Sequence, residues 1–307
     1  MGFLEEMGSR VLLFDGAMGT EIQKLSPKES DYPGGREGFA DGLTLTHPEW
    51  ISGIHRSYLE AGADCIETNS FGSNRIKLAE HGHGDRTVDV NRQIADVARR
   101  ARDEHGAGYV IGSMGPTGYL PSSDDPDLGQ LPLDDIREAF ALQAEGLVAG
   151  GADALLIETS QDILEVKLAI EACREAAPDA PVIANATLDK YGKMLLGTPV
   201  QAAYTTVSGM GADVFGLNCS TGPAEMEPSV RWLAGQDCRV LVVPNAGMPE
   251  NEGGTAVYKL GAEEMAEHLG RFVSSYGNVR VIGGCCGTGP GHIRAMRRVL
   301  DGVGGAA

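Results

Sequence analysis

Three cysteines are the residues of this sequence whose type and spacing best suit metal chemistry. Cys285 and Cys286 are adjacent between glycines in GGCCGT, and Cys219 follows the apolar run VFGLN. Three thiolates can fill three of the four tetrahedral positions of Zn²⁺ and leave the fourth open for a substrate, as in catalytic zinc sites. A single cysteine can instead be a small buried hydrophobic residue, and the glycines can serve only a turn. The residues alone leave both interpretations open.

Two acidic residues stand in similar positions after apolar runs. Asp15 follows VLLF, and Glu158 follows ALLI. Paired carboxylates beside a metal could recognise an ammonium group, although carboxylates at such positions can also only cap helices. The turn that begins with Gly16 and Ala17 could present backbone N–H groups to a carboxylate, as a nest does, or could simply connect a strand to a helix.

Eight short apolar runs, each bounded by turn residues, set the positions of these groups. Continuous rather than alternating apolar runs are typical of strands buried on both faces of a parallel sheet. The predicted strands are residues 10–14, 64–68, 109–113, 153–158, 182–186, 213–218, 240–244 and 280–284. Segments with helical periodicity lie between them, at residues 47–61, 88–104, 134–149, 162–176, 200–210, 224–233, 262–276 and 291–300.

Eight β–α units in 307 residues predict an α/β fold, a single (β/α)8 barrel that spans residues 1–307 as one domain. The competing architecture is a doubly wound open sheet, but no GxGxxG motif follows the first predicted strand. In a barrel the carboxyl ends of all strands meet at one mouth, where active sites lie. The cysteines and the two acids are therefore expected to converge there.

The composition excludes several classes of partner. The chain has 43 acidic and 25 basic residues and a net charge of −18, which argues against binding to nucleic acid or to an anionic membrane surface. No stretch approaches the roughly 20 apolar residues of a membrane span, and the first residues lack the features of a secretory signal. We therefore expect a cytoplasmic protein with reduced thiols.

Together, these motifs resemble those of a known family. The chain is similar to the homocysteine S-methyltransferases, above all to the homocysteine-binding barrel of cobalamin-dependent methionine synthase. The resemblance extends from residue 14 to residue 296. The matching stretches are FDGAMGTEIQ, LTHPEWISGIHRSYLEAGADCIETNSFGSNRIKL, GSMGPTGYL, DALLIETSQD, FGLNCSTGP, VPNAGMPE and GGCCGTGPGHIRAM.

The resemblance implies specific roles for residues of this chain. It implies one zinc ion per chain, with three ligands: Cys219, Cys285 and Cys286. It also implies that Asp15 and Glu158 hold the amino group of homocysteine, and that the backbone around Gly16, Ala17 and Thr68 meets its carboxylate. The implied reaction is transfer of a methyl group to the homocysteine thiol, which gives methionine.

The methyl donor is left open between two classes. One is a methylated corrinoid (methylcobalamin) on a separate protein, and the other is a small onium compound such as S-methylmethionine, dimethylsulfoniopropionate or betaine. Betaine-dependent relatives carry a tyrosine at the position of Gly72 and a C-terminal arm, and this sequence has neither. Because the sequence ends just after the last predicted helix, we expect the donor to come from outside the chain.

An onium donor would be attracted by aromatic rings through cation–π contacts. The candidates on segments near the mouth are Tyr32, Phe39, Trp50, Phe71 and Tyr119. The alternative function is that of a zinc-binding subunit of a methyl-transfer complex that acts on another thiol or on a selenol.

Overall fold

The computed structural model describes residues 2–253 and 255–304. The predicted domain covers residues 1–307, so its residues 1, 254 and 305–307 lie outside the described residues. Eight parallel strands form one sheet, and all eight were predicted. They are β1 (Leu12–Leu13), β2 (Cys65–Glu67), β3 (Tyr109–Met114), β4 (Ala154–Ser160), β5 (Val182–Ala186), β6 (Val214–Asn218), β7 (Val240–Val243) and β10 (Val279–Ile282).

The sheet closes into a barrel. Its order is β1-β10-β7-β6-β5-β4-β3-β2. A parallel bridge between Phe14 and Cys65 joins the two ends, and the N–H of Asp64 donates to the carbonyl of Leu13 at 2.7 Å. The predicted (β/α)8 barrel is therefore confirmed.

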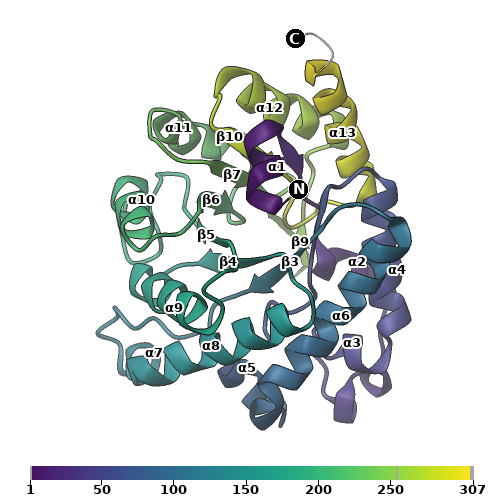
Figure 1. The fold of residues 1–307 in the computed structure, drawn as a ribbon, viewed down its shortest axis with the longest axis vertical. Coiled ribbons are helices and arrows are strands. Elements are labelled where there is room, and N and C mark those ends of the chain that lie inside the picture. Colours follow the sequence, from purple (N-terminus) through teal and green to yellow (C-terminus); the bar gives the residue numbers. More distant parts are fainter. Residues whose placement is uncertain (1, 254, 305–307) are drawn as a thin grey trace.

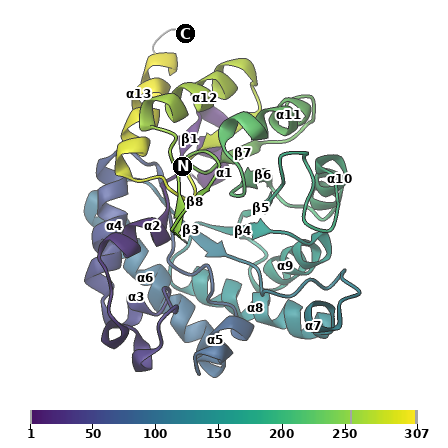
Figure 2. The same cartoon turned by 180° about the vertical axis from the view of Figure 1, so that it is seen from behind.

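Helices surround the strands, as Figures 1 and 2 show from opposite sides. The longer ones are α4 (Pro48–Glu60), α6 (Thr87–His105), α8 (Leu133–Ala149), α9 (Ile163–Ala176), α10 (Val200–Gly209), α11 (Pro223–Leu233), α12 (Ala262–Ser275) and α13 (Pro290–Gly304). The shorter ones are α2 (Met18–Lys24), α3 (Leu43–Thr46), α5 (Arg75–Glu80) and α7 (Pro126–Gly129). Among the helices within residues 2–253 and 255–304, none has both the length and the apolar character that a membrane span requires.

Several short elements of the fold were not predicted: the helices α2, α3, α5 and α7 and two further features. Helix α1 (Phe3–Ser9) places Phe3 and Met7 in the apolar cluster that fills the barrel, together with Leu12 and Phe14. An antiparallel hairpin, β8 (Glu250–Glu252) and β9 (Thr255–Val257), follows β7. Both elements are too short to produce a periodic pattern, and the hairpin residues of β8 are all exposed.

The barrel interior changes from apolar to polar toward the mouth. The apolar cluster contains Cys65, Ile111, Leu156 and Ile183, one from each of four neighbouring strands. Side chains two positions further along a strand point to the same side. That spacing gives a polar layer above the apolar one, made of Glu67, Ser113, Glu158 and Asn185. Because side chains alternate between the two faces along each strand, the strands place polar groups at the floor of the mouth.

Buried carboxylates fix the long segments around the mouth. The N–H and Oγ1 of Thr117 both donate to Glu165 Oε1, at 2.8 and 2.6 Å. Asp41 Oδ2 accepts from the N–H of Gly72 at 2.6 Å and from Ser73 Oγ at 2.9 Å. Hydrogen bonds to a charged acceptor are stronger than neutral ones, so these contacts hold the walls of the mouth in place.

The interior packing leads to a stability prediction. Leu156→Ala removes a fully buried side chain from the barrel interior. We expect the free energy of unfolding, measured with urea, to fall by about 2–5 kcal/mol. Leu195 is 62% exposed, so Leu195→Ala is the matched control and should change stability by less than about 0.5 kcal/mol. Equal effects of the two substitutions would contradict this packing.

Candidate functional site

The structure brings together the three cysteines that the sequence singled out. Cys219 follows β6, and Cys285 and Cys286 follow β10, with only β7 between these strands. Their Sγ atoms all lie within 4.8 Å of one another, and the Sγ atoms of Cys219 and Cys286 are 3.9 Å apart. Within the described residues, this is the only group of three or more Cys, His, Asp or Glu side chains placed to share a metal ion. The other three cysteines are free thiols elsewhere in the fold.

Hydrogen bonds of the backbone hold these thiols in position. Cys219 has a φ of +57°, a left-handed conformation that is strained for a residue with a side chain. Its N–H donates to Val243 O at 3.1 Å, and the N–H of Cys285 donates to Pro244 O at 2.8 Å. Both hydrogen bonds run to the strand β7 or its end, so one strand aligns both cysteine loops.

The thiols share hydrogen bonds with one another and with Tyr258. Hydrogen bonds from Cys219 and Cys285 lower the pKa of Cys286 to about 3, and the hydroxyl of Tyr258 adds to this shift. The same contacts, together with burial, raise the pKa of Cys285 well above its ordinary value. Without a cation, the cluster therefore favours a single thiolate. A second or third thiolate requires the positive charge of a cation. Tyr258 follows the unpredicted hairpin, and no spacing in the sequence linked it to the cysteines.

Three carboxyl groups lie beside the thiols, where the sequence indicated two. Asp15 Oδ2 accepts from the N–H of Glu67 at 3.0 Å, and Asp15 Oδ1 is buried without a partner among the described residues. Glu158 accepts from Ser113 Oγ and from Asn218 Nδ2. Burial raises the pKa of Glu158 to about 7. Burial and the charge of Glu158 raise the pKa of Glu67 well above its ordinary value.

A cavity of about 330 Å³ at the mouth joins the thiols and the acids. It is lined by all of the predicted site residues except Asp15, which is buried next to it: Gly16, Ala17, Thr68, Glu158, Cys219, Cys285 and Cys286. Glu67 and Ser113 also line it. The described residues that form its wall include no Lys, Arg or His. A cavity with this wall suits a ligand that carries a positive charge.

Two of the backbone groups that were predicted to meet a carboxylate, the N–H groups of Ala17 and Thr68, already have protein partners. The N–H of Ala17 donates to Thr288 Oγ1 at 3.2 Å, and the N–H of Thr68 donates to Ile111 O at 2.9 Å. A β-carbon at Gly16 would lie 2.9 Å from both Thr288 Oγ1 and the ring of Tyr58. Close packing thus requires the glycine, and contact of this turn with a substrate carboxylate stays a prediction.

The aromatic candidates are spread over the fold. Phe71, which is 41% exposed, lines the cavity. Phe39 is buried and stacks on His81, while Trp50 stacks on His47. Among the five aromatic candidates, only Phe71 belongs to the described wall of the cavity.

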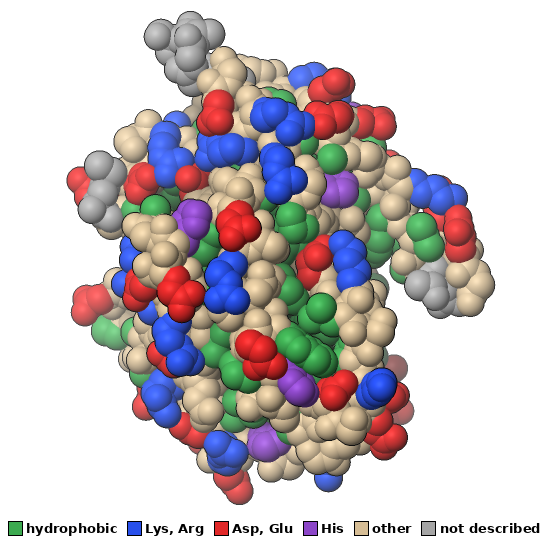
Figure 3. Space-filling view, turned by 90° about the vertical axis from the view of Figure 1, so that its right-hand side faces the viewer, with side chains coloured by type: hydrophobic (Ala, Val, Ile, Leu, Met, Phe, Trp, Pro, Cys, Tyr) green, Lys and Arg blue, Asp and Glu red, His purple; other side chains and the backbone are tan. Residues whose placement is uncertain are grey.

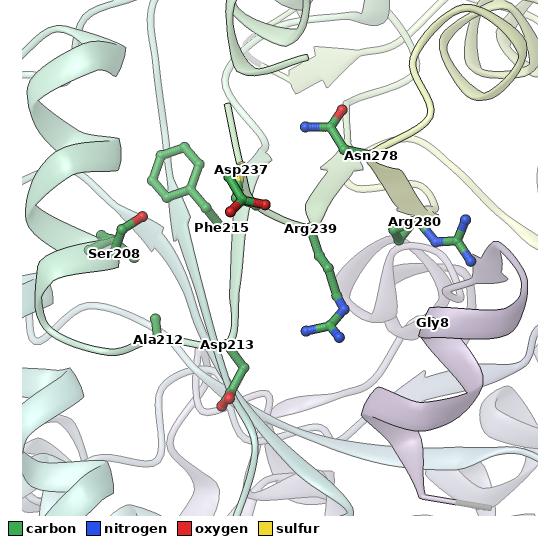
Figure 4. Close-up of a pocket in the computed structure, with 11 residues that line it drawn as sticks. Gly8, Ser208, Ala212, Asp213, Phe215, Asp237, Arg239, Asn278 and Arg280 are labelled. Atoms are coloured by element: carbon green, nitrogen blue, oxygen red, sulfur yellow. The ribbon is translucent and has the colours of Figure 1, made fainter. Parts of the chain in front are cut away.

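A second cavity, of about 630 Å³, lies at the amino-terminal ends of the strands (Figure 4). Arg239, Arg280 and Asn278 line it, and Asp213 in its wall is paired with Arg174. None of the predicted site residues reaches it. The mouth therefore carries the candidate site although its cavity is smaller.

Charged side chains of both signs are mixed on one face of the molecule. The face in Figure 3 carries acidic and basic side chains side by side, without a broad basic area. Many charged side chains of the described residues form ion pairs, for example Arg56 with Glu104 and Arg298 with Glu263.

Fold and site together define a (β/α)8 barrel with three thiols and three carboxyl groups at its mouth. The family model "Homocysteine S-methyltransferase" matches residues 12–300, so the chain belongs to this family. It is 42% identical over 310 residues to a methionine synthase of Mycobacterium tuberculosis, and the alignment covers 98% of this chain. A methionine synthase of Mycobacterium leprae is 41% identical over 314 residues. The chain spans 25% of the length of each of these relatives.

Solved structures show the same fold. The homocysteine methyltransferase MmuM of Escherichia coli, in its metallated form, aligns with a TM-score of 0.75 and 24% identity, and the alignment covers 94% of this chain and 96% of that one. Its oxidized form aligns with a TM-score of 0.76 and 23% identity, and covers 94% and 95% of the two chains.

The buried acid Glu158 leads to a prediction of pH dependence. Its pKa is raised from 4.5 to about 7, so the folded state keeps a proton that the unfolded state releases. This stabilisation is complete below about pH 4.5 and is lost as the pH rises through about 7. In the metal-free wild type, the free energy of unfolding should therefore fall between about pH 5 and pH 8. In Glu158→Gln, we expect this fall to be smaller by on the order of 1–3 kcal/mol.

The matched control for this measurement is Glu171→Gln, at an exposed glutamate of α9. It should leave the pH profile of urea unfolding unchanged. A Glu158→Gln profile that coincides with that of the wild type would show that Glu158 does not hold a proton in the folded state.

Proposed function

We propose that this chain is a zinc-dependent methyltransferase that moves a methyl group to the thiol of homocysteine and gives methionine. One observation carries the proposal: the Sγ atoms of Cys219, Cys285 and Cys286 lie within 4.8 Å of one another in the wall of an acidic cavity. The family and the methionine synthase relatives support the same reaction.

The three cysteines fit zinc in number, chemistry and spacing. Zn²⁺ prefers thiolate ligands at about 2.3 Å in tetrahedral geometry, which separates two sulfur ligands by about 3.8 Å. The Sγ atoms of Cys219 and Cys286 are 3.9 Å apart without any rearrangement. Zinc bound there would supply the positive charge that keeps the substrate thiol deprotonated at neutral pH. A set of three thiolates keeps the site negative overall, which favours an electron-rich sulfur.

The carboxyl groups of the chain bind and orient the amino end of the substrate. Asp15 Oδ1 is buried without a partner among the described residues, so it is available to an ammonium group. Ser113 and Asn218 fix the direction of the Glu158 carboxylate through hydrogen bonds. With its amino group held by these acids, homocysteine directs its thiol toward the cysteines in the same cavity. The donor then has to present its methyl group in line, at about 3–3.5 Å from the sulfur.

We further propose that the methyl donor is a methylated corrinoid on a separate protein. The methionine synthase relatives support this choice. A small onium compound is the second choice, supported by the acidic cavity and by Phe71 in its wall. The proposal includes a single homocysteine-binding barrel over residues 1–307 that works in the cytoplasm, where its six free thiols stay reduced.

The zinc ligands give the first test. Cys285→Ser should lose bound zinc, measured by mass spectrometry of the metal content, and should reduce methionine formation to the background rate. Cys238→Ser changes a half-buried cysteine outside the cluster and is the matched control. Full activity of zinc-free Cys285→Ser would overturn the proposed role of the cluster.

The donor is tested with zinc-loaded protein, homocysteine and a panel of donors. The panel contains methylcobalamin, S-methylmethionine, dimethylsulfoniopropionate, betaine and methyltetrahydrofolate, with methionine followed by mass spectrometry. We expect turnover with methylcobalamin. Turnover with an onium compound alone would replace the corrinoid proposal. No methionine from any donor, with one zinc per chain bound, would favour another thiol or selenol as the acceptor.

A further inference from the structure

Glu67 is an acid of the mouth that lies in a motif of the sequence but was given no role there. It is the last residue of β2 and follows Cys65 by two positions, and Cys65 belongs to the apolar interior of the barrel. The period of the strand therefore directs the Glu67 side chain inward as well. It lines the mouth cavity together with Glu158, and its backbone N–H donates to the buried Asp15.

The carboxyl group of Glu67 differs from its two neighbours in having no partner. Glu158 is held by Ser113 and Asn218, and one oxygen of Asp15 is held by the Glu67 N–H. For the Glu67 carboxyl group, no hydrogen bond or ion pair is formed within residues 2–253 and 255–304. The Glu67 side chain is partly exposed and lines the cavity, so its carboxyl group is open to a ligand bound there. The described wall of the cavity includes no basic side chain that could pair with it, so a ligand with a positive charge would be its first charged partner.

The number of acids matches the number of donors on an α-ammonium group. Such a group has three N–H bonds, like the ammonium of a lysine side chain. Glu158 and Glu67 line the cavity, and Asp15, whose Oδ1 has no partner among the described residues, is buried next to it, so the three carboxyl groups together offer three acceptors. We propose that Glu67 accepts the third N–H of the homocysteine ammonium and determines the preference of the site for an amino acid over a thiol acid that lacks the amino group. This inference rests on the proposed function, which by itself requires only Asp15 and Glu158.

The test compares two thiols that differ only in the amino group. Homocysteine and 4-mercaptobutanoate share the thiol, the chain length and the carboxylate. Their binding to zinc-loaded protein is measured by isothermal titration calorimetry, which needs no methyl donor, and the KM and kcat of each are measured with the active donor. Glu67→Gln keeps the shape of the side chain and removes its charge. Glu60→Gln, at an exposed position of α4, is the matched control.

We expect Glu67→Gln to weaken homocysteine binding by about 10-fold, because the ammonium group exchanges a charged acceptor for a neutral amide oxygen. Binding of 4-mercaptobutanoate should change by less than about 2-fold, because this thiol has no ammonium group. The kcat for homocysteine should also change by less than about 2-fold, because Asp15 and Glu158 still orient the bound amino group. Zinc content and melting temperature should match those of the wild type.

Three results would overturn the inference. Equal weakening of both thiols by Glu67→Gln would assign Glu67 to the shape of the mouth rather than to the ammonium group. Unchanged homocysteine binding would show that Asp15 and Glu158 suffice. Wild-type protein that binds homocysteine but makes no methionine would count against the proposed reaction alone, since the calorimetric comparison still decides the role of Glu67. Wild-type protein that binds neither thiol would overturn both proposals.

Discussion

Closure of the barrel concentrates groups that favour negative charge in a small volume with little water. Three thiols and three carboxyl groups meet at the mouth, and the described cavity wall offers no basic side chain to balance them. Burial, with a contribution from neighbouring charges, raises the pKa of Glu67 and of Glu158, and hydrogen bonds with Cys219 and Cys286, together with burial, raise the pKa of Cys285. Added positive charge can balance these thiols and carboxyl groups in two places. A metal cation satisfies the thiols, and an ammonium group satisfies the acids, so the two parts of the proposed substrate site follow from one electrostatic constraint.

The rest of the fold keeps these groups in place against their mutual repulsion. The apolar interior, with Leu156 and Ile183 among its members, sets the height of the polar layer above it. Buried carboxylates at Asp41 and Glu165 accept hydrogen bonds from the loops and fix the walls around the cavity. Strand β7 aligns both cysteine loops through hydrogen bonds to Cys219 and Cys285. A rigid frame of this kind supplies orientation, which is the main contribution that a protein makes to methyl transfer between two bound molecules.

The sequence predicted the barrel well because each strand is a continuous apolar run bounded by turn residues. β5, at Val182–Ala186, has the predicted bounds, and the other strands differ by a few residues at their ends. The convergence of Cys219 with Cys285 and Cys286 was predictable for the same reason, since the order of strands in a barrel is fixed. Helix α1 and the hairpin of β8 and β9 were missed because both are too short to show a period. The unpartnered state of Glu67 and the contact of Tyr258 with Cys286 depend on tertiary packing, which no local pattern contains.

The central claim is that Cys219, Cys285 and Cys286 hold one zinc ion and leave one position for the thiol of homocysteine. X-ray absorption at the zinc edge measures this directly, because it counts the sulfur atoms bound to the metal. We expect three sulfur ligands in the zinc-loaded protein and a fourth after addition of homocysteine. Zinc bound mainly by nitrogen or oxygen, or a sulfur count that homocysteine leaves unchanged, would contradict the account.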